Sequence, residues 1–120
     1  MQKLTKAEEQ VMQIIWDLES CMVSEILDKI GEPKPPHSTI SSVVRILEKK
    51  EFVTHKAYGR TYVYSPIISR EDYSKFALGK MANNFFGGSV KRLVSFLVKE
   101  NDLDLNEISE LLDELDKTEK

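Results

Sequence analysis

The sequence predicts a mainly helical fold with a small β wing, in which a winged helix-turn-helix domain precedes a C-terminal helical dimerisation region. One observation is the apolar spacing of three and four residues over residues 40–47, which indicates an amphipathic helix. A second is the change after Lys50 to two short segments rich in Val, Thr and Tyr, which indicates a β-hairpin. A third is the set of further amphipathic helical segments on both sides of this pair.

Length and composition are those of an ordinary globular protein. The chain has 120 residues, enough for one compact domain or a small domain with an appendage, and 41% of them are hydrophobic. No apolar run approaches the roughly 20 residues that span a membrane, and the N-terminus lacks the apolar core of a secretory signal. We therefore expect no membrane insertion. The single cysteine, Cys21, fits a cytoplasmic protein, and with only two histidines no metal site or other cofactor is expected.

The distribution of charge favours a local surface for nucleic acid, although the net charge is −3. Residues 1–33 hold 3 Lys/Arg and 7 Asp/Glu, and residues 61–120 hold 8 and 11. Residues 34–60 hold 6 Lys/Arg against 2 Asp/Glu, which gives +4 and makes this the only positive third of the chain. Phosphate-binding surfaces show this kind of local asymmetry.

Two helices are expected before the candidate recognition helix. Thr5-Lys6-Ala7-Glu8 is a capping box directly ahead of an apolar period, so a helix is predicted over residues 5–19. A second helix is predicted over residues 23–31, where Gly31 is a natural stop. Cys21 lies between them and is interpreted as a small buried hydrophobe, because no cluster of cations adjoins it to lower its pKa.

The recognition helix is expected to follow the three prolines of residues 32–36, with His37 or Ser38 as its N-cap. Its apolar face is predicted to comprise Ile40, Val43, Val44 and Leu47. The opposite face carries small hydroxyls and cations, which suits close approach to DNA. The DNA contacts predicted in this segment are His37, Ser38, Thr39, Ser41, Ser42, Arg45 and Lys49. Arg45 is the first candidate for a guanine contact through its planar guanidinium.

The hairpin is the expected wing. Strands are predicted over residues 52–56 and 60–64, and Gly59 between them supplies the positive φ of a tight turn. His55, Lys56 and Arg60 add to the predicted DNA surface, where the cations of the wing and Lys49 are expected to contact phosphates.

Three amphipathic helices are expected in the C-terminal part, over residues 69–86, 89–99 and 105–116, with Gly87-Gly88 between the first two. Too little neighbouring chain remains to bury their apolar surface, so we expect a second copy of the chain to cover it. The predicted organisation is a winged-helix domain over residues 1–66 and a dimerisation region over residues 67–120. The dimerisation residues predicted are Tyr73, Phe76, Leu93, Leu97, Ile108, Leu111, Leu112 and Leu115.

Two function classes fit these features. The leading prediction is a DNA-binding repressor that works as a homodimer on double-stranded DNA. The alternative is a winged-helix protein–protein adaptor, in which the cations of the helix and wing are incidental. A steep salt dependence of duplex binding separates the two. An enzyme is not expected, because the chain has no Gly-rich phosphate loop, nucleophile–base pair or metal-ligand spacing.

Several short motifs, in order, also match a known family. They include Leu4-Thr5-x-Ala7-Glu8 in the first helix, Leu47-Glu48-Lys49-Lys50 in the recognition helix and Tyr62-x-Tyr64-Ser65-Pro66 in the wing. Phe86-Gly87-Gly88-Ser89 follows further on. On these motifs the chain resembles the penicillinase-repressor family of BlaI/MecI/CopY type over nearly its whole length.

This resemblance implies a dimeric bacterial repressor that sits on inverted-repeat operators of resistance or stress genes. In the antibiotic-responsive members, a membrane-bound sensor metalloprotease relieves repression by cleaving the repressor. The scissile Asn-Phe of staphylococcal-type members aligns with Ser95-Phe96, which is therefore the candidate cleavage site. Glu51 stands where the family usually has glycine, and the cysteine-rich tail of the copper-responsive branch is absent.

Overall fold

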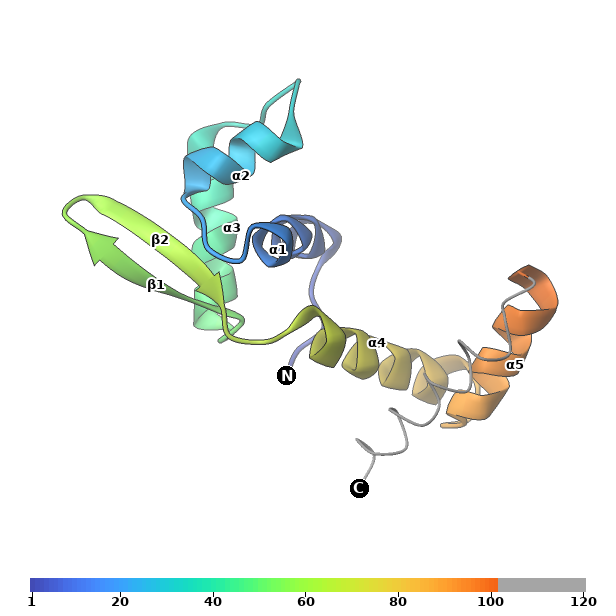
Figure 1. The fold of residues 1–120 in the computed structure, drawn as a ribbon. Coiled ribbons are helices and arrows are strands. Elements are labelled where there is room, and N and C mark those ends of the chain that lie inside the picture. Colours follow the sequence, from blue (N-terminus) through green and yellow to red (C-terminus); the bar gives the residue numbers. More distant parts are fainter. Residues whose placement is uncertain (102–120) are drawn as a thin grey trace. The chain divides into compact units, whose positions relative to one another are not determined.

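A computed structural model describes residues 1–101 and divides the chain into two compact units, Met1–Arg70 and a second that begins at Glu71. The first contains α1 (Lys6–Leu18), α2 (Val23–Ile30), α3 (His37–Lys49) and the antiparallel strands β1 (Val53–Tyr58) and β2 (Thr61–Pro66) (Figure 1). α4 (Arg70–Phe85) and α5 (Val90–Asn101) follow. The predicted fold class, mainly helical with a β wing, is confirmed.

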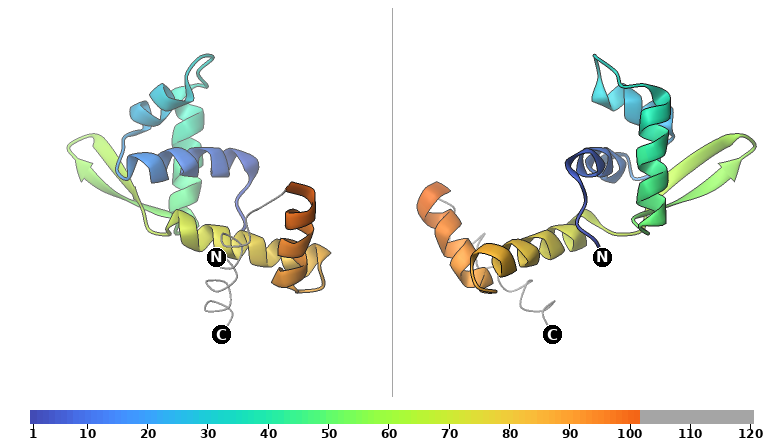
Figure 2. Two further views of the ribbon diagram at one scale, coloured as in Figure 1. Left: turned by 45° about the vertical axis from the view of Figure 1, so that its right-hand side comes forward. Right: turned by 180° about the vertical axis from the view of Figure 1, so that it is seen from behind.

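The core of the first unit lies where the three helices meet the base of the hairpin. Both views in Figure 2 show α1, α2 and α3 lying together, with the hairpin extending from one side of them. Three of the four residues predicted for the apolar face of α3, Ile40, Val44 and Leu47, are at most 5% exposed, whereas Val43 is only half-buried. The other buried apolar side chains of this unit are Leu4, Val11, Met12, Ile15, Cys21, Ile26, Phe52, Val53 and Tyr64.

A buried ion pair connects the start of α1 to the end of α3. The predicted capping box is present, because the Thr5 hydroxyl accepts a hydrogen bond from the Glu8 amide at 3.2 Å and the Glu8 carboxylate accepts one from the Thr5 amide at 2.9 Å. The same Glu8 oxygen, Oε1, lies 2.7 Å from Lys50 Nζ. Glu8 is only 6% exposed, so this carboxylate is held inside the unit by its cap and its cation.

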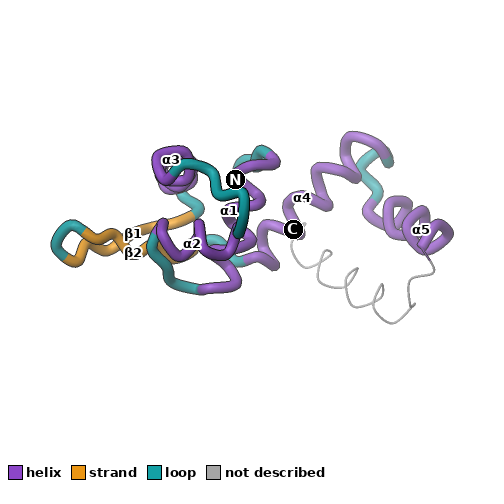
Figure 3. The backbone as a smooth tube through the Cα atoms, turned by 90° about the horizontal axis from the view of Figure 1, so that it is seen from above, coloured by secondary structure: helices purple, strands orange, loops and turns teal. Residues whose placement is uncertain are grey.

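The hairpin is longer than predicted and its turn lies one residue further along. Val53 pairs with Pro66 and Tyr58 with Thr61, which leaves Gly59 and Arg60 as the two-residue loop. Gly59 has a φ of 63°, as predicted for a tight turn at this glycine. Arg60 therefore belongs to the tip of the wing itself. Figure 3 shows the two strands projecting away from the helices of this unit.

A short backbone bridge ties the wing to the segment between α1 and α2. The Cys21 amide donates to the Tyr64 carbonyl at 2.9 Å, and the Tyr64 amide donates to the Cys21 carbonyl at 2.7 Å. Cys21 is 1% exposed, which confirms its interpretation as a small buried hydrophobe. Burial, reinforced by the negative charge of Glu25, raises the pKa of its thiol to about 11, so the thiol is protonated and unreactive at neutral pH.

The predicted N-cap of the recognition helix was wrong. Pro36 occupies the cap position in an extended conformation, and its carbonyl accepts from the Thr39 and Ile40 amides. His37 and Ser38 are the first helical residues and neither caps the helix with its side chain. Proline suits this place because its missing N–H and fixed φ cost nothing before the first turn. The exposed Ser38 hydroxyl is thus not used as a cap.

The last turn of α3 closes with a Schellman motif built on Glu51. The Phe52 amide donates to the Leu47 carbonyl at 2.9 Å, the Glu51 amide donates to the Glu48 carbonyl at 3.0 Å, and Phe52 and Leu47 are both fully buried. Glu51 has a φ of 67°, in the left-handed region that glycine adopts freely. Glycine, the residue that the family resemblance leads one to expect at position 51, would adopt this conformation without strain.

Replacing Glu51 by glycine is therefore expected to raise the free energy of unfolding by up to ~1 kcal/mol, because the strain at a positive φ is relieved. Glu51→Ala is the matched control, since alanine loses the same carboxylate but keeps the Cβ. Thermal or urea unfolding of the two variants measures the difference. A lower stability of Glu51→Gly than of the wild type would show that the Glu51 side chain makes a stabilising contact.

The second unit has its own apolar cluster between α4 and α5. Gly87 and Gly88 join the two helices at φ values of 59° and 83°, which agrees with the break predicted there. The buried members of the cluster are Ala82, Val90, Leu93 and Val94, and Leu78, Phe86, Leu97 and Val98 pack against it. Among the residues described, no helix is both long and apolar enough to cross a membrane.

Candidate nucleic-acid interface

The outward face of α3 presents the side chains that were predicted to meet DNA. Ser42, Arg45 and Lys49 follow one another along the helix at spacings of three and four residues, and all three are exposed. His37, Ser38 and Thr39 are exposed on the first turn, and Ser41 is half-buried with its hydroxyl 3.3 Å from His37 Nδ1. The inward face of the same helix is core, so the helix is fixed with its polar side outward.

The two faces of the wing differ because side chains alternate along each strand. The pairing places His55 opposite Tyr64 and Ala57 opposite Tyr62 on one face, whereas Lys56 lies opposite Val63 on the other. Lys56 and the loop residue Arg60 are exposed, as predicted for cations that contact phosphates. The wing therefore offers one cation on its outer face and one at its tip.

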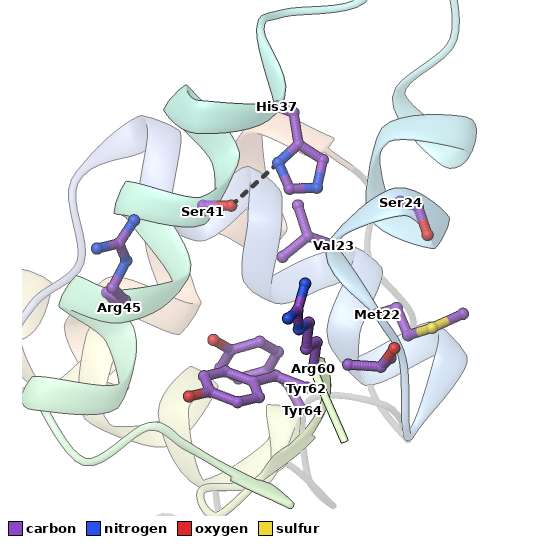
Figure 4. Close-up of a pocket in the computed structure, with 10 residues that line it drawn as sticks. Met22, Val23, Ser24, His37, Ser41, Arg45, Arg60, Tyr62 and Tyr64 are labelled. Carbon is purple, nitrogen blue, oxygen red and sulfur yellow. Dashed lines mark hydrogen bonds between the residues drawn. The ribbon is translucent and has the colours of Figure 1, made fainter. Parts of the chain in front are cut away.

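A groove with a cavity volume of about 580 Å³ lies between α3, the wing and the start of α2. Figure 4 shows His37, Ser41 and Arg45 along α3, with Arg60 and the rings of Tyr62 and Tyr64 from the wing. The remaining lining residues are Met22, Val23, Ser24 and Thr61. Four of the predicted DNA-binding residues thus share one groove with two tyrosines.

Tyr62 and Tyr64 were not among the predicted site residues. The sequence does carry a signal for them, because their two-residue spacing on a strand puts them on the same face. Tyr62 is 49% exposed and Tyr64 is 5% exposed. Burial first and the charge of Glu48 second raise the pKa of Tyr64, outweighing the opposite effect of Arg45. The Tyr64 phenol is therefore protonated at neutral pH.

His55 lies in a contact between the wing and α3 instead of pointing outward. Its Nδ1 is 2.5 Å from Glu48 Oε2, and its ring is stacked on Tyr62. Its side chain is 30% exposed. Among the ten predicted DNA-binding residues, His55 is thus the one whose ring joins the wing to α3.

The electrostatic balance of this surface is positive. Arg45, Lys49, Lys56 and Arg60 are all exposed cations on α3 or the wing. Glu48, an acid on the same helix, is half-buried and contacts the ring of His55. Cations at this density attract polyanions and bind phosphates, and a guanidinium on the helix can also form paired hydrogen bonds with a base edge.

The predicted residues of the second unit fall into three groups. Leu93 is 1% exposed and packs in the unit's own cluster, with Leu97 against it, whereas Tyr73 is buried with its ring 6.2 Å from that of Phe76. Ser95 is exposed and Phe96 is 51% exposed near the middle of α5. The remaining predicted dimerisation residues, Ile108, Leu111, Leu112 and Leu115, lie outside the described residues.

Comparison with known proteins identifies relatives of this arrangement. The model of the penicillinase repressor family matches residues 4–117. A penicillinase repressor of Staphylococcus aureus is 32% identical over 98% of this chain and 94% of its own. The methicillin resistance regulatory protein MecI of S. aureus strain N315 is 28% identical over 96% and 94%. The solution structure of the monomeric form of Bacillus licheniformis BlaI with the blaP half-operator superposes with a TM-score of 0.50, at 30% identity, over 60% of this chain and 89% of that one.

Proposed function

The chain belongs to the penicillinase repressor family, and on this premise we propose that it represses transcription as a homodimer bound to an inverted-repeat operator. It is a DNA-binding transcriptional repressor and not an enzyme. The observation that carries this function is the exposed, cationic outer face of α3 beside a wing tipped by Arg60. A DNA ligand and a buried, protonated thiol suit the cytoplasmic location expected from the sequence.

In this proposal α3 enters the major groove and the wing follows the backbone. Arg45 would form paired hydrogen bonds with a guanine edge, and the small hydroxyls around it would allow the helix to come close. Lys49, Lys56 and Arg60 would contact phosphates, which fixes orientation but carries no sequence information. The B. licheniformis BlaI complex holds a monomeric form with a half-operator, which supports one half-site for each winged-helix unit.

Removing Arg45 is expected to weaken operator binding by about 1–3 kcal/mol and to relax selectivity at one base pair of each half-site. Lys49→Ala is the matched control on the same helix face, and it should weaken all duplexes alike and flatten the salt slope by about one unit. Duplexes enriched from a random pool by the full chain supply the probe for anisotropy titrations. An Arg45→Ala variant with wild-type affinity and selectivity would mean that α3 does not read bases through this residue.

Dimerisation is proposed to reside in the second unit. Large apolar side chains remain exposed on its described part, with Met81 at 45%, Phe85 at 77% and Phe96 at 51%. Apolar side chains that gather on an exposed surface mark sites of contact with another chain. Leu93 would contribute by holding α5 on α4, because it packs inside its own unit. Joining two units in this way would place two recognition helices on two half-sites.

Relief of repression is proposed to come from cleavage at Ser95-Phe96 by a membrane-bound sensor metalloprotease. Both side chains are accessible, but the bond lies within α5, so local opening of the helix must precede cleavage. Cutting there would detach Leu97 and Val98 from the cluster between α4 and α5 and weaken the joint of the dimer.

Mass spectrometry of the protein from cells with induced target genes is expected to find a fragment that ends at Ser95. The same cells before induction are the control and should contain only the full-length chain. Full-length repressor that has left its operator, without any such fragment, would rule out this route of induction.

A further inference from the structure

An isoleucine stands on the exposed face of the recognition helix. Ile46 is 44% exposed, and it is the one large apolar side chain of α3 that the structure leaves open to solvent. It belongs to a stripe of exposed residues spaced by three and four positions, which lie on one side of a helix. The other members of this stripe are Thr39, Ser42 and Lys49. Figure 3 views α3 along its axis, at the edge of the first unit.

The fold of the first unit does not require an isoleucine at this position. The core side of α3 is formed by Ile40, Val44 and Leu47, and Ile46 is not part of it. A β-branched side chain is also less favourable in a helix than leucine, lysine or glutamate. Isolated exposed apolar side chains are common on proteins, so the meaning of Ile46 comes from its position within the proposed DNA surface.

Ile46 and its neighbour Arg45 face different sides of that surface. Consecutive residues of an α-helix point about 100° apart. Arg45 lines the groove that α3 forms with the wing, whereas Ile46 does not line it. The recognition helix therefore presents two side chains of different chemistry next to one another, a guanidinium that donates hydrogen bonds and an aliphatic chain that neither donates nor accepts them.

The chemistry of the major groove selects a partner for an aliphatic side chain. Among the four bases, thymine alone presents an apolar group there, its C5-methyl. The edges of guanine, cytosine and adenine present hydrogen-bond donors and acceptors, which an isoleucine would cover without pairing them. Contact with a thymine methyl, in contrast, removes two apolar surfaces from water.

We propose that Ile46 is a specificity-determining residue that contacts the C5-methyl of one thymine in each half-site. This inference rests on the proposed repressor function. A guanine contact by Arg45 and a thymine contact by Ile46 fall on different base pairs, so each side chain determines its own position of the operator. Burial of one methyl group favours thymine over an unmethylated pyrimidine by about fourfold in affinity for each half-site.

The test replaces each thymine of the selected duplex in turn by deoxyuridine, which lacks only the C5-methyl, and measures the affinity by anisotropy at constant salt. The wild-type full chain is expected to lose about fourfold at one thymine for each half-site changed. Ile46→Ala should bind the thymine and deoxyuridine duplexes equally at that position. Ile67→Ala is the matched control, because Ile67 is an exposed isoleucine that follows β2, and it should keep the wild-type pattern.

A wild type that shows no loss at any thymine would overturn the proposal, and so would the same loss in Ile46→Ala, because another group would then contact the methyl. Thermal unfolding shows whether each variant is folded. If Ile46→Ala does not fold, Ile46→Val replaces it, and an unchanged ratio between the thymine and deoxyuridine duplexes would contradict the contact. If the wild type binds all duplexes alike, the repressor function itself fails, whereas selective binding without a deoxyuridine effect refutes only the role of Ile46.

Discussion

A fragment that ends at Arg70 is expected to stay folded, to sediment as a monomer, and to bind a duplex with two half-sites about 10²- to 10⁴-fold more weakly than the full chain. The first unit has its own core and ends at this residue. The segment after β2 belongs to it, because Trp16 Nε1 donates to the Ile68 carbonyl at 2.8 Å and Arg70 lies 2.6 Å from Asp17. Ending the fragment at Pro66 would remove both contacts.

A duplex with a single half-site is the control for this loss. The fragment and the full chain should bind it with similar affinity, because only one unit can be engaged. Analytical ultracentrifugation gives the oligomeric state of both proteins. A fragment that still dimerises at micromolar concentration would place the dimer interface in the winged-helix unit.

Replacing Lys50 by methionine is expected to lower the free energy of unfolding by about 3 kcal/mol, because it leaves the Glu8 carboxylate buried without its cation. Glu8 and Lys50 side chains are 7% and 23% exposed, so solvent replaces the lost partner poorly. Lys49→Met is the matched control, because Lys49 is exposed and its replacement should change the stability little. The double variant Glu8→Gln/Lys50→Met should recover part of the loss. Equal stability of the Lys50 and Lys49 variants in urea unfolding would contradict a structural role for the pair.

The same pair predicts how the protein responds to acid. Burial alone would raise the pKa of Glu8, but the hydrogen bonds from Lys50 and Thr5 together with the charge of Lys50 hold it below its ordinary value of 4.5. A carboxyl with a lowered pKa in the folded state stabilises the fold above its ordinary pKa, and this stabilisation is lost as the pH falls. Glu8→Gln should therefore be less stable than the wild type at neutral pH and converge with it in acid.

Local patterns predicted much of this molecule. The apolar period over residues 40–47 identified the buried face of α3, and the capping box at Thr5 and Glu8 identified the start of α1. The glycine expected in the family at position 51 pointed to a left-handed residue, and Glu51 adopts that conformation. Each of these features depends on residues a few positions apart, which a sequence displays directly.

The features that were missed join residues distant in the sequence. Lys50 lies 42 positions from Glu8, and Cys21 bridges to Tyr64 across two helices and a strand. The groove formed with Tyr62 arises only when the wing folds beside α3. The capping residue Pro36 was missed for a different reason, because a side-chain cap is expected at a helix start and here the backbone alone suffices. Pairings between distant residues depend on the tertiary fold and have no local signal.

The most direct test of the central claim, that α3 and the wing form the DNA-reading surface, is a titration of the ¹⁵N-labelled full chain with its selected duplex, followed by amide chemical shifts. We predict that the largest changes fall on residues 37–45 of α3 and residues 56–61 of the wing, and that they weaken together as salt is added. Changes confined to the second unit, or changes on α1 that leave α3 and the wing unaffected, would contradict this account.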